Sequence, residues 1–345
     1  MMNPTLIKPK VAAFEVTGRC VLHCRHCRAA AVEHGTDPLD TTACKAILRK
    51  VADYTRCLLI FTGGEPMMRE DIFDLVAYSR SLGQRPVMAT CGAGLDRQTM
   101  LELKKRGLLS FSFSLDGADS LAHDSFRQHE RAFALVMQAV QAANDAGIRF
   151  QINTTLTRLN VDSLESIAAL AVSLGATCWN PFVLVPVGRG DAIRQLLLEP
   201  QEYERVLERL ADLKATLPIE MRLTCGPQFA RVARQRHLPK AEKVGGCLAA
   251  TEFVFISRKG DVQTCGFLEL SAGNLVKENY TFGHIWERSP LLCGLRDLSR
   301  YEGACGRCEY VKLCRGCRAR ALSASGSVYG EDPICLRAQQ KKEGR

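Results

Sequence analysis

The chain has 345 residues, 46% of them hydrophobic and 24% charged, a composition typical of a globular protein with about two domains. It contains neither a run of eighteen apolar residues nor a secretory-signal pattern, so we expect a cytoplasmic protein without a membrane span. The net charge of +9 comes from dispersed Lys and Arg residues, which favours a solvated surface over nucleic-acid binding.

Short apolar segments alternate with longer amphipathic ones through the first half of the chain. We predict strands over residues 11–16, 57–61, 86–90, 109–115, 149–156 and 178–185, and helices over residues 41–54, 72–81, 98–106, 133–146 and 164–174. This alternation predicts a parallel sheet with helices packed outside it. Six β/α units are too few for a complete eight-stranded barrel, so we predict an α/β fold with a partial, TIM-like (β/α)6 barrel in residues 1–220. Residues 221–345 are predicted to form a second, cysteine-rich domain.

Sixteen cysteines are the feature that most needs explanation. Disulfides are disfavoured in a cytosolic protein, so clustered cysteines indicate metal ligation. Five are scattered through regular segments and are predicted to be small buried hydrophobes: Cys44, Cys57, Cys91, Cys178 and Cys293. Three lie near the start of the chain, and the last third holds Cys225, Cys247, Cys265, Cys305, Cys308, Cys314, Cys317 and Cys335.

The first group, Cys20, Cys24 and Cys27, follows the first predicted strand with the spacing Cys-x3-Cys-x2-Cys. Three thiolates within eight residues can bind three irons of a [4Fe–4S] cluster and leave the fourth iron open to an external ligand. A zinc site completed by a nearby histidine (His23, His26 or His34) is the alternative. The spacing resembles the signature of the radical S-adenosylmethionine (SAM) superfamily, in which the cluster binds SAM and cleaves it.

Further segments carry the same resemblance. Gly63-Gly64-Glu65-Pro66, after the second predicted strand, is similar to the segment that receives the SAM amino group in that superfamily, where glycines allow close backbone approach. By the same resemblance Ser114 and Asp116 are expected at the SAM ribose, and Arg127 at its carboxylate unless it forms a surface ion pair. Asn153, in the fifth strand, is expected at the same barrel mouth. The sequence departs from the pattern at two positions, with His26 in place of an aromatic residue and Cys91–Gly92 in place of Asn-Gly.

The C-terminal cysteines resemble the seven-cysteine SPASM extension of radical SAM enzymes, which binds auxiliary [4Fe–4S] clusters. Their pattern begins with Cys247 and continues with Gly260 and Cys265. A run of four cysteines follows (Cys305, Cys308, Cys314 and Cys317), and Cys335 ends the pattern. The final gap in the run has two residues where three are usual. The resemblance implies one or two auxiliary clusters, one held by Cys305, Cys308, Cys314 and Cys335. Cys247, Cys265 and Cys317 are candidates for the other, with Cys225 as a fourth ligand. Read alone, the Cys-x2-Cys pairs would also suit a zinc ribbon.

Several segments, among them Arg28-Ala-Ala-Ala31 and Phe126-Arg-Gln128, resemble the tetrapyrrole-modifying SPASM enzymes of the siroheme-dependent heme pathway, most closely its heme b synthases. That resemblance implies oxidative decarboxylation of two propionates of iron-coproporphyrin III to vinyl groups, started by a 5′-deoxyadenosyl radical. It also implies a flavodoxin- or ferredoxin-type electron donor and a separate electron acceptor. A tetracarboxylate substrate needs cationic partners, for which Arg189 is the candidate; a structural role for it is the alternative.

Three other functions remain open at this point. One is a didecarboxysiroheme deacetylase or a heme d1-pathway enzyme of the same group. Another is a SPASM peptide maturase. Many such enzymes carry an N-terminal peptide-recognition domain, and the nineteen residues before Cys20 are too few for one, which counts against this function. The third is a zinc-stabilised scaffold that binds a partner protein.

Overall fold

The computed structural model describes residues 7–277 and 281–343, in which nine strands form one sheet. Their order across the sheet is β7-β6-β5-β4-β3-β2-β1-β8-β9. Neighbouring strands are parallel except for the antiparallel pair of β8 and β9. The strands are β1 Val11–Thr17, β2 Leu58–Gly63, β3 Arg85–Thr90, β4 Ser110–Ser114, β5 Arg149–Leu156, β6 Cys178–Val183, β7 Glu220–Met221, β8 Phe253–Ile256 and β9 Val262–Gln263.

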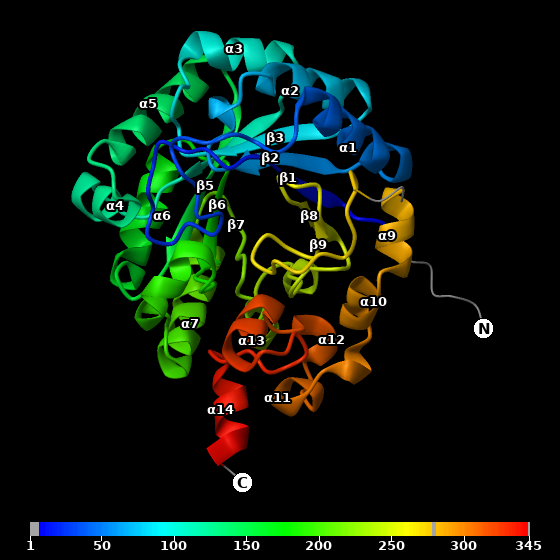
Figure 1. Ribbon diagram of the computed structural model, residues 1–345. Coiled ribbons are helices and arrows are strands. Elements are labelled where there is room, and N and C mark those ends of the chain that lie inside the picture. The colour runs from blue at the N-terminus through cyan, green and yellow to red at the C-terminus, as the bar shows by residue number, and fades with distance from the viewer. Residues whose placement is uncertain (1–6, 278–280, 344–345) are drawn as a thin grey trace.

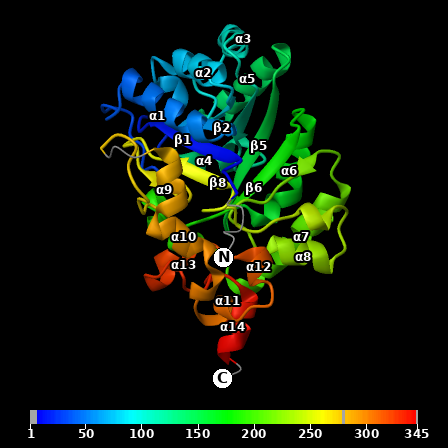
Figure 2. The ribbon, with the colours of Figure 1, turned by 90° about the vertical axis from the view of Figure 1, so that its right-hand side faces the viewer.

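Helices connect successive strands on the outside of the curved sheet, as Figure 1 shows for α1 to α6. The helices of this part of the chain are α1 Thr41–Tyr54, α2 Ile72–Ser81, α3 Arg97–Lys105, α4 Ser120–Arg127, α5 Ala132–Asp145, α6 Leu164–Ser173, α7 Pro200–Thr216 and α8 Phe229–Gln235. The helices after the sheet are α9 Phe282–Arg288, α10 Pro290–Arg296, α11 Gly303–Gly306, α12 Val311–Cys314, α13 Arg318–Ser325 and α14 Leu336–Glu343. Of these, α11 to α14 gather at the end of the molecule opposite α1 to α3 (Figure 2).

The predicted α/β fold with six β/α units is confirmed by β1 to β6, and α1 and α2 begin and end at the predicted residues. Two of the features that were not predicted bear on the site. Helix α4 lies between β4 and α5, and its N-terminus is capped by Asp119, which accepts a hydrogen bond from Ala122 N. Strand β8 pairs with β1, Val11 facing Phe253, so the cysteine-rich part of the chain extends the barrel sheet.

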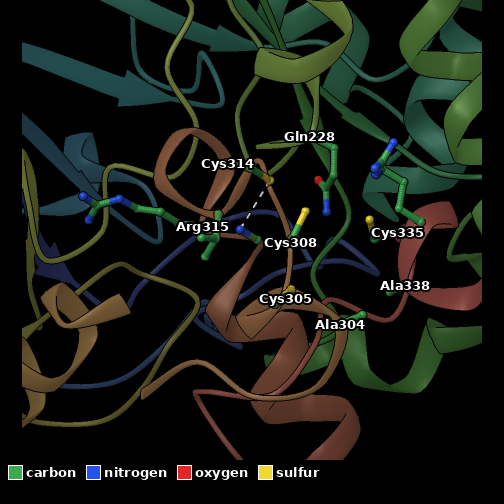
Figure 3. Close-up of a pocket in the computed structure, with 11 residues that line it drawn as sticks. Gln228, Ala304, Cys305, Cys308, Cys314, Arg315, Cys335 and Ala338 are labelled. Carbon is green, nitrogen blue, oxygen red and sulfur yellow. Dashed lines mark hydrogen bonds between the residues drawn. The ribbon is translucent and has the colours of Figure 1, made fainter. Parts of the chain in front are cut away.

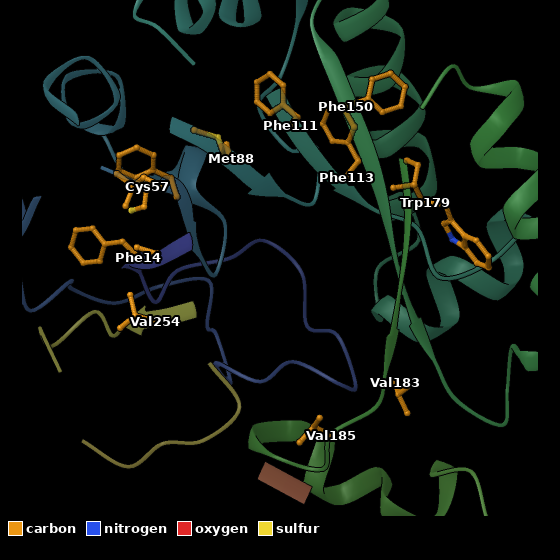
Figure 4. Packing of buried hydrophobic residues seen from close by; sticks show 14 of the residues in the cluster. Phe14, Cys57, Met88, Phe111, Phe113, Phe150, Trp179, Val183, Val185 and Val254 are labelled. Atoms are coloured by element: carbon orange, nitrogen blue, oxygen red, sulfur yellow. The ribbon is translucent and has the colours of Figure 1, made fainter. Parts of the chain in front are cut away.

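Alternation along β4 and β5 separates the helix-facing side of the sheet from its inner side. Phe111, Phe113 and Phe150 are buried in the hydrophobic core, with ring centroids 5.5 Å apart between Phe111 and Phe113 and between Phe113 and Phe150 (Figure 4). Because successive side chains of a strand point to opposite faces, Ser114 and Asn153 face the inside of the barrel. These two residues are paired in the β4–β5 register, which brings them side by side.

No helix in the described ranges is both long and apolar enough to cross a membrane. The cytoplasmic location stays a prediction.

Candidate active site

The three N-terminal cysteines lie on the loop between β1 and α1, at the carboxyl ends of the parallel strands. Cys20, Cys24 and Cys27 line a cavity of about 210 Å³ inside the barrel mouth. Among the residues predicted to bind SAM, those that line the same cavity are Gly63, Gly64, Ser114, Arg127 and Asn153. Glu65, Pro66 and Asp116 are buried and are not among the residues lining the cavity. The loops after β1, β2, β4 and β5 therefore converge, as expected for a parallel barrel.

Gly63 and Gly64 let the end of β2 pack directly against the cysteine loop. Gly64 N donates to Thr17 O at 2.9 Å, and Glu65 N donates to Arg19 O at 2.7 Å. A Cβ atom on Gly64 would lie 2.1 Å from Arg19 O, and one on Gly63 would lie 2.5 Å from Thr17 O. Both contacts are far below van der Waals distance and involve backbone atoms, so only glycine fits at these positions.

Glu65 joins the ends of β2 and β3 from beneath the cavity. Its carboxylate accepts hydrogen bonds from Thr90 Oγ1 at 2.8 Å and from Cys91 N at 2.7 Å. It also caps the short helical turn Pro66–Met68 by accepting from Met67 N. Burial raises the pKa of Glu65, and these hydrogen bonds oppose that shift. The Glu65 side chain thus orders the strand ends, while the adjoining glycines face the cavity.

Asp116 and Arg127 form a buried ion pair rather than a surface one. Arg127 Nη2 lies 2.6 Å from Asp116 Oδ2, and Thr155 N donates to Asp116 Oδ1 at 2.6 Å. Burial alone would raise the pKa of Asp116, but Arg127, His26, His123 and the Thr155 hydrogen bond together outweigh it, and the pKa falls. Arg127 Nη1 also donates to Cys24 Sγ at 3.7 Å. The pair therefore fixes Cys24 from the side of α4.

His26 stacks on Phe126, with ring centroids 4.4 Å apart and ring planes 10° apart. Burial lowers the pKa of His26 to about 3, against the opposing charge of Asp116, whose Oδ2 is 3.9 Å from His26 Nε2. The ring also lines the cavity. A flat stacked ring here fills the place where an aromatic residue was expected from the superfamily pattern.

Arg189 holds the cysteine loop instead of facing the cavity. Its Nε donates to Cys24 O at 2.9 Å, and its Nη1 donates to Ala31 O at 2.6 Å. These contacts favour the structural alternative for Arg189 over the predicted role in binding substrate carboxylates. A guanidinium spanning two carbonyls of one irregular loop satisfies backbone acceptors that no strand or helix satisfies there.

Two residues of the cavity were missed by sequence reasoning. Cys91, taken for a buried hydrophobe, lines the cavity and hydrogen-bonds to the thiol of Cys20, which lowers the pKa of Cys20. Its position directly after β3 was the available signal, since functional groups gather at strand ends. Arg28 also lines the cavity, 3.1 Å from Glu15 Oε1 and 4.5 Å above the Phe255 ring. Because Phe255 comes from β8, this contact was invisible without the β1–β8 pairing.

The other scattered cysteines are not at the site. Cys44, Cys57 and Cys178 are buried, as predicted, whereas Cys293 is exposed and its thiol donates to Glu287 O at 3.3 Å. The prediction of burial was wrong for Cys293, because it lies on the outer side of the short helix α10.

Four C-terminal cysteines surround a small pocket, the outer cysteine set: Cys305, Cys308, Cys314 and Cys335. Figure 3 shows these side chains around a common space together with Gln228. Arg318 Nη2 donates to Cys305 Sγ at 3.6 Å, and Gly316 N donates to Cys314 Sγ at 3.4 Å. Donors aimed at the sulfur atoms suit thiolate ligands better than buried thiols.

The remaining four cysteines form the inner cysteine set: Cys225, Cys247, Cys265 and Cys317. Cys225 interacts electrostatically with the other three, and Cys265 interacts with Cys247 and Cys317. Burial, followed by these neighbouring thiols, raises the pKa of Cys265 to about 12. The two sets adjoin, since Cys247 N donates to Cys314 O at 3.1 Å. The grouping matches the two ligand sets expected from the SPASM resemblance.

Within residues 7–277 and 281–343, no three Cys, His, Asp or Glu side chains lie close enough together to bind one metal ion. A cubane cluster does not require that closeness, because each cysteine binds a different iron. The donor sets, all thiols in groups of three, four and four, therefore fit iron–sulfur clusters.

The fold and the site together define the class of protein. A parallel partial barrel with a Cys-x3-Cys-x2-Cys loop after its first strand belongs to the radical SAM enzymes, and the profile of the Radical SAM superfamily matches residues 14–171. Enzymes of this superfamily use SAM and a [4Fe–4S] cluster for radical chemistry.

Comparison with characterised proteins narrows the class. The chain is 40% identical to the AdoMet-dependent heme synthase of Nitratidesulfovibrio vulgaris, over 94% of this chain and 92% of that protein. It is 28% identical to the Fe-coproporphyrin III synthase of Methanosarcina barkeri, over 97% of this chain and 89% of that protein. The chain belongs to the family of AdoMet-dependent heme synthases, radical SAM enzymes of heme biosynthesis.

Among solved structures, SuiB of Streptococcus suis bound to the precursor peptide SuiA is similar in fold. The TM-score is 0.76 at 18% identity, over 95% of this chain and 76% of that one. At this identity the likeness concerns the fold alone.

Proposed function

We propose that the enzyme converts iron-coproporphyrin III to heme b by oxidative decarboxylation of two propionate side chains. The observation that carries the proposal is the 40% identity to an AdoMet-dependent heme synthase along nearly the whole of both chains. For each propionate, one hydrogen atom leaves the β-carbon, carbon dioxide leaves the carboxylate, and one electron is released as the vinyl group forms.

In this proposal Cys20, Cys24 and Cys27 bind three irons of a [4Fe–4S] cluster and leave one iron open. When bound, the cluster and SAM supply the 5′-deoxyadenosyl radical that removes the hydrogen atom. Gly63 and Gly64 offer backbone to the SAM amino group, and Ser114 and Asn153 offer polar side chains from the barrel interior. Glu65, Pro66 and Asp116 act one layer behind these contacts, because they order the strand ends and Arg127.

Arg28 is our candidate for binding a substrate carboxylate. Two arginines line the cavity, and Arg127 is already paired with Asp116 and Cys24. Arg28 makes one ion pair, to Glu15 Oε1, and a guanidinium carries five N–H donors. Glu15 and the Phe255 ring hold the guanidinium plane in place, which leaves donors for a propionate without loss of side-chain freedom on binding.

We also propose that the outer and inner cysteine sets bind two auxiliary [4Fe–4S] clusters, which take the released electron to an external one-electron acceptor protein. A flavodoxin- or ferredoxin-type protein is the proposed donor to the SAM-binding cluster. Residues 1–220 would then form the SAM-binding domain and residues 221–345 the auxiliary-cluster domain, with β8 and β9 as the part of the second that joins the sheet of the first.

The test is anaerobic incubation of the reconstituted enzyme with SAM, a reductant and iron-coproporphyrin III, followed by chromatography of both products. We expect heme b together with 5′-deoxyadenosine, in a ratio of one heme to two deoxyadenosines. Deoxyadenosine with an unaltered porphyrin would contradict the substrate assignment while leaving the radical chemistry intact.

A second candidate is removal of acetate side chains from didecarboxysiroheme. It is favoured by the similarity, at lower identity, to a protein named for Fe-coproporphyrin III, the product of that reaction. The same assay with didecarboxysiroheme separates the two: loss of acetate groups without vinyl formation would favour this candidate.

A further inference from the structure

A buried ion pair lies between the two C-terminal cysteine sets. Arg320 Nε and Nη2 donate to Asp332 Oδ1 at 2.9 Å and Oδ2 at 2.8 Å, and both side chains are fully buried. Asp332 Oδ2 also accepts from Gln228 Nε2 at 2.7 Å and from Cys317 N at 2.9 Å. Tyr203 completes the network by donating to Gln228 Oε1 at 2.8 Å. A fully buried charge pair is costly unless every lone pair and proton is used, so this placement calls for a role.

The two ends of the pair face different cysteine sets. Asp332 interacts electrostatically with Cys314 and Cys335 of the outer set, and Gln228, bonded to its carboxylate, lines the outer pocket. Arg320 interacts with Cys317 and Cys225 of the inner set. Asp332 also contacts the inner set through Cys317 N, but the inner thiols interact with Arg320 and the outer thiols with Asp332. The pair is therefore a fixed dipole with its negative end nearer the outer thiols and its positive end nearer the inner ones.

One donor of the pair is left over. Arg320 Nη1 is buried and has no hydrogen-bond partner in the part of the chain that the structure describes. A buried guanidinium N–H without an acceptor is strongly disfavoured, whereas the sulfur atoms of an iron–sulfur cluster are hydrogen-bond acceptors. An inner cluster would supply the missing acceptor.

A nearby charge and a hydrogen bond to sulfur both change the reduction potential of an iron–sulfur cluster. Reduction adds a negative charge, so a nearby cation or an N–H bonded to sulfur stabilises the reduced form and a nearby anion destabilises it. We propose that the Arg320–Asp332 ion pair shifts the reduction potentials of the two auxiliary clusters in opposite directions, raising that of the inner cluster and lowering that of the outer one. Arg320 and Asp332 are thus positioning residues and not ligands.

This inference rests on the proposed function, because it requires clusters at both cysteine sets. The inner set lies beside the barrel cavity: Cys265 is bridged to Leu268, and Phe267 between them lines the cavity. Each decarboxylation oxidises the substrate radical by one electron. A raised potential at the inner cluster favours its reduction by that electron. Onward transfer through the lowered outer cluster is then uphill, and an external acceptor protein of higher potential drives it.

The test is potentiometric titration followed by electron paramagnetic resonance, in a full-length chain whose SAM-binding cysteines are replaced (Cys20→Ala, Cys24→Ala and Cys27→Ala). Each auxiliary cluster is titrated alone, the inner one after adding Cys305→Ala and Cys308→Ala, and the outer one after adding Cys247→Ala and Cys265→Ala. In these backgrounds Arg320→Met, Asp332→Asn and the two changes together are compared with the parent. The double variant keeps no unpaired buried charge and so guards against loss of folding.

With Arg320→Met we expect both potentials to fall, the inner one more. With Asp332→Asn we expect both to rise, the outer one more. With the double variant we expect the inner potential to fall and the outer to rise. Arg209→Met, which removes a surface ion pair with Glu165, should change neither. Equal shifts of the two reduction potentials would overturn the inference. So would the absence of a shift in a double variant that carries its full complement of iron. Missing iron in the parent would instead contradict the proposed cluster sites.

Discussion

The barrel mouth and the C-terminal cysteine region present thiols by different means. At the barrel mouth, regular parallel strands β1 to β6 deliver loops to one edge, and backbone hydrogen bonds set the geometry. In the C-terminal region α11 and α12 have four residues each, too short to be stable on their own. Side chains hold it instead: buried Arg318 donates to Val328 O and Gly330 O, and partly buried Glu331 accepts from Ala304 N. The first site depends on the sheet, with the Asp116–Arg127 pair and Arg189 as added supports. The second has little regular structure and depends on side chains and, in our proposal, on its clusters.

The largest effect should come from a ligand at the barrel mouth. Cys24→Ala is expected to abolish formation of 5′-deoxyadenosine, while the auxiliary sites stay filled and about four of roughly twelve irons are lost. Iron analysis and chromatography after reconstitution check both statements. A loss of all the iron would show that the C-terminal sites depend on the barrel site, and would contradict the contrast between the two regions.

Gly64→Ala tests whether the sheet positions the cysteine loop. The added Cβ would meet Arg19 O at 2.1 Å, so the loop must shift, and we expect SAM cleavage to fall at least about tenfold, since a displacement near 1 Å costs that much or more. Gly245→Ala is the matched control, because a Cβ there would have its nearest neighbour 4.0 Å away. Equal activities of the two variants would show that the loop does not need the close approach.

Asp332→Asn tests the dependence of the C-terminal region on buried charge. Leaving Arg320 buried and unpaired is expected to cost about 3–5 kcal/mol of unfolding free energy. Glu165→Gln, which breaks the partly exposed pair with Arg209, should cost about 1 kcal/mol or less. Denaturant unfolding of both variants gives the comparison, and similar losses would mean that the buried pair is not what holds this region.

Arg28→Gln separates substrate binding from SAM cleavage. We expect KM for the porphyrin to rise about tenfold through loss of one charged hydrogen-bonded contact, with uncoupled SAM cleavage unchanged. Arg28→Lys should recover little of this, because an ammonium lacks the planar fork that Glu15 and Phe255 orient. Steady-state kinetics with the porphyrin varied are decisive: a fall in kcat alone would argue against carboxylate binding.

The smallest effect is expected at a scattered cysteine. Cys44 is fully buried between α1 and the sheet, away from both sites. Cys44→Ala should leave the iron content unchanged and cost about 1 kcal/mol, the typical consequence of a small core truncation. Iron analysis and thermal unfolding test this, and a loss of iron would show that Cys44 is more than a core residue.

Local patterns in the sequence were enough for the six β/α units and for the place of the cysteine loop. The expected grouping of the C-terminal cysteines came from the family resemblance instead. Period-two and amphipathic patterns report which face of an element is buried, and parallel connectivity then brings every strand end to one edge. Ser114 and Asn153 were found in this way, since each lies at or near the carboxyl end of its own strand.

Contacts between distant segments were decided only by the tertiary structure. Arg189 turned from a predicted substrate residue into a support for Cys24 O, and Arg28 became a cavity residue because β8 brings Phe255 beside β1. Cys91 meets Cys20, and Arg320 meets Asp332, across chain separations that no periodic pattern records. The sequence determines the chemistry of each side chain. The partner of that side chain depends on which surfaces pack together, and this packing is a property of the whole fold.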